Sequence, residues 1–111
     1  MTNRLLSASS IQGTSVCNAQ GEDLGEIEDL MIDVRSDGRI EYAVLSFGGF
    51  LGLGEKYFAI PMSQLSADRD DEKIILNVDK DRLKNAPGFD KDNWPDFSSP
   101  KFKDDIHAYY A

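Results

Sequence analysis

The feature that most constrains the fold of this chain is a hairpin pattern. Two segments with strand-like alternation, "GEIEDLMIDV" at 25–34 and "IEYAVLSF" at 40–47, flank the turn sequence "RSDGR". The Asp37-Gly38 pair in this turn is a strong hairpin signal, because these residues tolerate positive φ. The second segment is apolar on both faces, which predicts a central strand or one covered by another element. In the first segment, a change of alternation near Asp29 predicts a β-bulge.

Three further strand patterns accompany this hairpin in the first 78 residues, at 14–19, 56–65 and 74–78. Pro61 cannot donate a hydrogen bond to a sheet, so its strand should bend or lie at an edge there. The charged segment 66–73 is expected to be a turn. Short strands at this spacing predict a mainly β fold, either a small antiparallel barrel or a sandwich.

The pattern changes after residue 78. The segment 79–88 begins with Asp79, a good N-cap, and ends in Pro-Gly, so it predicts one short helix. The tail at 90–111 is too rich in aromatic residues for a disordered segment, and we expect it to pack on its own barrel or on a neighbouring subunit. Its apolar residues, together with Phe89, are Trp94, Phe97, Phe102, Ile106, Tyr109 and Tyr110.

Length and charge narrow the classes of function. A chain of 111 residues predicts one domain, and its one cysteine, Cys17, allows no internal disulfide. The formal net charge of −8 argues against nucleic-acid binding and against docking on anionic lipid, since both need clustered Lys and Arg. We find no signal-peptide pattern and no apolar run long enough to span a membrane. We therefore expect a cytoplasmic protein with no nucleic-acid partner and no membrane insertion.

The glycine-rich segment at 48–54 raises the question of phosphate binding. A Walker loop needs Lys and then Ser or Thr after its last glycine, but Glu55 and Lys56 follow here. A Rossmann fingerprint needs a different glycine spacing and a helix afterwards, whereas a strand pattern follows. We interpret the segment as a hairpin connection whose apolar residues cap the barrel end or join a subunit interface; these are Phe50, Leu51 and Leu53.

Other reactive residues do not form a recognisable catalytic or metal-binding set. His107 is the only histidine, so one chain cannot hold a metal site built from several histidines. We also expect no histidine-dependent catalytic triad. Cys17 lies on a strand pattern and is expected to be a buried, inert thiol. The acidic runs at 68–72 and 90–96 lack the EF-hand pattern and are expected to be solvated. We predict no catalytic residue, no metal and no cofactor.

The order of several motifs resembles that of the PRC-barrel domain family. The motifs are "GTSV", "NAQGEDLGEIEDLMID", "GRIEYAVLSFGGFLGLG", "FAIP" and "LNVDKDRLKNAPGF". The resemblance is greatest to stand-alone bacterial members, and it extends to related domains in the photosynthetic reaction-centre H subunit and in a ribosome-maturation protein. It implies a six-stranded, partly open β-barrel at 5–89, followed by the tail at 90–111. It also implies an assembly module and not a catalyst.

These observations together predict a non-enzymatic protein-interaction module that forms a homodimer and binds a protein partner not identified by sequence. The expected contact residues lie in the glycine-rich loop and the tail: Phe50, Leu51, Leu53, Trp94, Phe97, Tyr109 and Tyr110. The alternative is a small-ligand binding protein that uses the barrel mouth. Its polar contacts would come from Tyr42, Tyr57 or Arg39.

Overall fold

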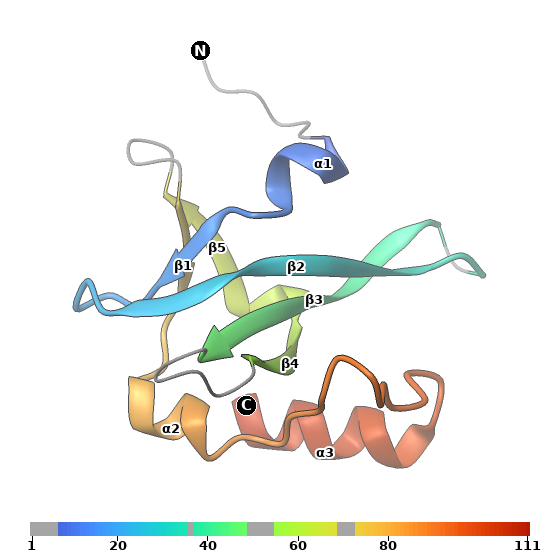
Figure 1. The fold of residues 1–111 in the computed structure, drawn as a ribbon. Coiled ribbons are helices and arrows are strands. Elements are labelled where there is room, and N and C mark those ends of the chain that lie inside the picture. The colour runs from blue at the N-terminus through green and yellow to red at the C-terminus, as the bar shows by residue number, and fades with distance from the viewer. Residues whose placement is uncertain (1–6, 36, 49–54, 69–72) are drawn as a thin grey trace.

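Six β-strands form one strongly curled sheet in the computed structural model, which describes residues 7–35, 37–48, 55–68 and 73–111 (Figure 1). The strands lie in the order β4-β3-β2-β1-β6-β5, so the barrel is open between β4 and β5. This confirms the expected mainly β, six-stranded, partly open barrel. The strands are β1 (Ser15–Cys17), β2 (Asp23–Asp33), β3 (Arg39–Gly48), β4 (Glu55–Pro61), β5 (Leu65–Asp68) and β6 (Lys73–Leu76).

One strand pairing corrects the expectation of a wholly antiparallel sheet. β1 and β6 run parallel, with Val16 opposite Ile74, while β6 and β5 form an antiparallel pair. The long chain path from β1 to β6 allows them to run in the same direction, which a tight hairpin would not. The sheet is therefore mixed.

The hairpin of β2 and β3 is confirmed, and both strands lie inside the sheet, with β3 next to the edge strand β4. The register between the two strands shifts between Ile27 and Asp29, so the predicted bulge is present. β3 also pairs with β4, and its residues from Tyr42 to Phe47 are all buried. β3 is thus an internal strand that is buried on both faces, in agreement with the apolar residues on both of its faces.

The segment 56–65 is not one strand, as we had predicted, because it is divided at Pro61. β4 ends at Pro61, a 3₁₀ turn, η2 (Met62–Gln64), follows, and β5 begins at Leu65. Consequently the expected turn at 66–73 is wrong where β5 occupies it. β4 lies at one edge of the sheet, where a proline is tolerated, as the sequence predicted.

The outer edge of β4 is partly covered by the chain that follows the second helix. Phe89 exchanges two backbone hydrogen bonds with Tyr57, of 2.8 and 2.9 Å. The preceding Gly88 permits this approach, because a Cβ atom there would lie 2.9 Å from the Tyr57 carbonyl oxygen. The covered edge cannot pair with another strand at this point.

The helices are α1 (Ala8–Ile11), α2 (Lys80–Lys84) and α3 (Pro100–Tyr110). The predicted cap of α2 is confirmed, since the Asp79 side chain accepts a hydrogen bond from the Arg82 amide. We had expected only this one helix, so α1 and α3 both correct that prediction, α3 for the tail. Ser99 caps α3 and Pro100 occupies its first turn, a combination that favours a helix start.

Helices α2 and α3 lie together against one side of the curled sheet (Figure 1). Leu83 and Ala86, within and just after α2, join the same buried cluster as the strand residues. Ile106 and Tyr110 of α3 join it too, and they are only 1% and 5% exposed. The C-terminal segment thus contributes side chains to the core of its own barrel.

Candidate functional site

A continuous aromatic cluster joins the tail to the sheet. We call it the aromatic cluster and define it by six residues: Tyr42, Tyr57, Phe89, Trp94, Phe97 and Phe102. Phe97 is central, with its ring centroid 5.7 Å from that of Tyr42 and 5.0 Å from that of Phe102. The ring centroid of Trp94 lies 5.1 Å from that of Phe89, with the two rings tilted. The tilted and edge-on geometries are the favourable ones for aromatic pairs.

Of the predicted contact residues, Trp94 and Phe97 are brought together in this cluster. Their ring centroids lie 6.1 Å apart. Trp94 keeps 38% of its surface exposed, and its indole N–H donates a 2.8 Å hydrogen bond to the Lys91 carbonyl oxygen. Trp94 therefore presents one side of its ring to solvent, although its polar atom is already occupied.

Tyr109 and Tyr110 lie apart from Trp94, at the C-terminal end of α3. The Arg82 guanidinium donates a hydrogen bond to the Tyr109 carbonyl oxygen, and the Tyr109 hydroxyl donates one to the Arg82 carbonyl oxygen. The guanidinium also lies 4.6 Å from the Tyr109 ring centroid. Because a cation is favourable at a helix C-terminus, this contact fixes the end of α3 to α2.

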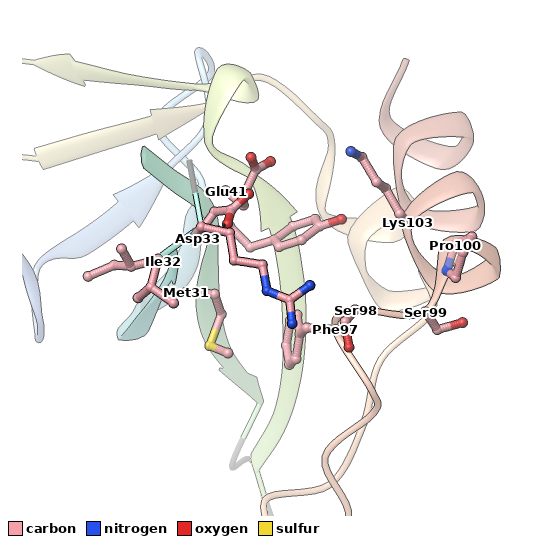
Figure 2. A pocket seen from close by; sticks show the side chains of 12 residues that line it. Met31, Ile32, Asp33, Glu41, Phe97, Ser98, Ser99, Pro100 and Lys103 are labelled. Carbon is pink, nitrogen blue, oxygen red and sulfur yellow. Dashed lines mark hydrogen bonds between the residues drawn. The ribbon is translucent and has the colours of Figure 1, made fainter. Parts of the chain in front are cut away.

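A pocket of about 770 Å³ separates the end of the β2–β3 hairpin from the start of α3 (Figure 2). Hairpin residues such as Met31 and Glu41 lie on one side, and Pro100 and Lys103 lie on the other (Figure 2). The full lining is Met31, Ile32, Asp33, Val34, Arg35, Glu41, Tyr42, Phe97, Ser98, Ser99, Pro100 and Lys103. It combines apolar side chains with two acids and two bases.

The hairpin side of the pocket is a two-stranded ribbon. β1 pairs with β2 only as far as Glu26, and β4 pairs with β3 only from Tyr42 onward. Among the described residues, 30–33 therefore pair only with β3 and 39–41 only with β2; we call these two segments the β2–β3 ribbon. Such a ribbon is at best marginally stable without cover on one of its faces.

The ribbon end carries the most exposed large hydrophobic residues in the described part of the chain. Ile32 is 51% exposed and Val34 is 85% exposed. We define the hairpin–tail face as the apolar residues that line the pocket from both sides: Met31, Ile32, Val34, Phe97 and Pro100. Sequence reasoning missed Ile32 and Val34 as contact residues. The sequence shows that Ile32 and Val34 alternate with Asp33 and Arg35. It does not show that, among the described residues, β1 and β4 end before they reach this part of the hairpin.

Tyr42 lies between the pocket and α3. Its hydroxyl is buried without a hydrogen-bond partner among the described residues, as is Nε2 of His107, whose ring centroid lies 5.9 Å away. Burial, with a smaller contribution from Glu41, raises the pKa of Tyr42 above its ordinary value. Tyr42 is therefore a neutral, mainly apolar part of the wall.

The remaining predicted residues lie elsewhere or outside the described structure. The Tyr57 hydroxyl donates a 2.9 Å hydrogen bond to Glu28, and neither Tyr57 nor Arg39 lines the pocket. Phe50, Leu51 and Leu53 fall outside the described residues. Across 7–35, 37–48, 55–68 and 73–111, no group of three His, Cys, Asp or Glu side chains is placed to hold a metal ion.

The curled six-stranded sheet, closed on one side by two helices, defines this chain as a small β-barrel domain protein. The profile of the PRC-barrel domain matches residues 4–83, most of the chain, and the chain therefore belongs to the PRC-barrel family. A search among curated proteins gave no match. In the described part of the chain, no helix has the length and apolar character needed to cross a membrane.

Proposed function

We propose that this protein is a non-enzymatic protein-interaction module and that the hairpin–tail face is its contact surface. Membership of the PRC-barrel family supports the first part, since these domains are generally non-catalytic modules. The observation that carries the second part is the exposure of Ile32 and Val34, 51% and 85%, at the rim of the pocket. Clustered exposed apolar residues with a polar surround mark interaction sites.

Trp94 and Phe97 extend this proposed surface along the tail. Phe97 lines the pocket, and Trp94 contacts Phe97 and is partly exposed. Aromatic anchors of this kind supply much of the binding energy in protein interfaces. The contact role of Tyr109 and Tyr110 stays a prediction, because in this structure they hold α3 to the body of the protein. The same holds for the contact role of Phe50, Leu51 and Leu53.

Affinity capture from native lysate tests the proposal. The paired variant Ile32→Ser with Val34→Ser should still unfold in one cooperative urea transition, because both side chains are exposed on the single chain, and should lose a partner that the wild type retains. A control with two exposed alanines changed, Ala19→Ser and Ala108→Ser, should retain it. Equal recovery of every partner by all three proteins would show that the face is not the contact surface.

A second candidate function is small-ligand binding in the same pocket. Its volume of about 770 Å³ favours this reading, since ligand sites usually measure about 300–1,000 Å³. Native mass spectrometry of the purified protein would show a defined added mass if a ligand is bound. The added mass should disappear when Phe97→Glu places a charge in the pocket wall, and a mass equal to that of the bare chain would count against this candidate.

A further inference from the structure

The pocket has a charge balance that differs from that of the whole chain. Its lining contains two acids, Asp33 and Glu41, and two bases, Arg35 and Lys103, and so sums to zero. The full chain carries a formal net charge of −8. The pocket is thus a locally neutral, apolar surface on an acidic protein.

The zero net charge of the pocket lining indicates which kind of partner can bind to this surface. Two copies of an acidic chain repel each other over most of their surfaces, so a contact between them is favoured where the local charge is balanced. In a two-fold interface, the same patch meets itself, and a residue of one copy contacts a different residue of the other. A patch with equal numbers of acids and bases can satisfy this requirement, whereas a patch of one sign cannot.

We propose that the hairpin–tail face binds a second copy of this chain, with the β2–β3 ribbon of each copy packed into the pocket of the other. The inference rests on the proposed function, and it names the partner. Ile32 and Val34 lie on the ribbon end that also forms one wall of the pocket. A two-fold axis beside this wall would cover both exposed side chains and place Glu41 of one copy near Lys103 of the other. It would also cover the ribbon, which no further strand flanks within the described residues.

Matched charge reversals test this arrangement by sedimentation velocity and native mass spectrometry. Glu41→Lys changes the lining from neutral to +2, and Lys103→Glu changes it to −2, so each variant should weaken self-association by about tenfold or more. An equimolar mixture of the two should form a mixed dimer with one copy of each. Neither side chain makes a hydrogen bond within the described structure that the substitution would break. Lys84→Glu on α2, outside the pocket, changes the net charge as Lys103→Glu does and should dimerise like the wild type.

The results separate this inference from the proposed function. A wild type that stays monomeric at high concentration, or variants that dimerise as well as Lys84→Glu, would overturn the second-copy inference. If such a monomer still captures another protein through Ile32 and Val34, the proposed function stands although the second-copy inference is wrong. Dimerisation that is weakened in each variant and restored in the mixture supports the inference, even if no other partner is captured. The paired Ile32→Ser and Val34→Ser variant gives an independent check, since it should also be monomeric.

Discussion

Ile106→Ala tests whether the C-terminal helix α3 is part of the cooperative fold. Ile106 is 1% exposed and belongs to the core cluster that contains strand residues such as Leu45 and Phe58. The substitution removes three buried carbon groups, at about 0.8 kcal/mol each, or about 2.4 kcal/mol in transfer free energy. The cavity left behind adds to this, and such changes usually cost about 2–5 kcal/mol. We expect the free energy of unfolding to fall by about 3 kcal/mol.

Urea denaturation followed by far-ultraviolet circular dichroism and by Trp94 fluorescence measures this loss. With a slope of about 1–3 kcal/mol per molar urea, the midpoint should fall by roughly 1–3 M. Ile32→Ala, compared in the Lys103→Glu background that is expected to be monomeric, is the matched control, because it deletes the same atoms from a side chain that is 51% exposed on the single chain, and it should cost less than about 1 kcal/mol. Similar losses for the two variants would refute the reasoning that α3 packs in the core.

The same measurement in the Lys103→Glu background separates packing within one chain from exchange of the tail between two chains. If α3 packs on its own barrel, Ile106→Ala should cost as much in a protein expected to be monomeric. A much smaller cost in that background would indicate that the helix is buried by a neighbouring copy.

Two further predictions concern backbone fit and pH. Gly25→Ala should cost at least about 2 kcal/mol more than Gly21→Ala in urea denaturation. Both glycines have positive φ, but only at Gly25 would a Cβ atom lie 2.0 Å from the Ser46 carbonyl oxygen; equal costs would contradict this. Burial raises the pKa of Tyr110 above its ordinary value of 10.0, so the folded state favours the neutral hydroxyl. The resulting stability is complete below pH 10 and decreases as the pH rises above it. Tyr110→Phe should reduce this alkaline loss in urea midpoints, and an unchanged pH profile would exclude Tyr110 as its source.

The parts of the fold that local patterns determine were predictable from sequence. The Asp37-Gly38 turn and the alternation on each side specify the β2–β3 hairpin, and the change of alternation near Asp29 specifies its bulge. The cap at Asp79 is likewise a local hydrogen bond. In each case the residues that form the structure are neighbours in sequence or across one short turn.

Two of the elements that were not predicted, β5 and α3, were missed for different physical reasons. β5 was hidden because its four residues lie in a polar segment, and its strand form depends on pairing with β6. α3 has a readable start in Ser99 and Pro100, but its aromatic residues indicate packing and do not by themselves indicate a helix. The pocket could not be predicted, since it joins segments about sixty residues apart that only tertiary packing brings together.

The position of the proposed contact surface can be traced to a single proline. Pro61 ends β4, and it lies opposite Tyr42 in the register with β3. In the part of the chain that the structure describes, the residues of β3 before Tyr42 therefore have no strand on that side. On the other side, pairing with the N-terminal segment ends near Ile27. The ribbon that remains extends beyond its neighbours and exposes apolar side chains, which a monomeric barrel would not require. A proline that limits one edge strand thus creates the surface that we propose binds a second copy.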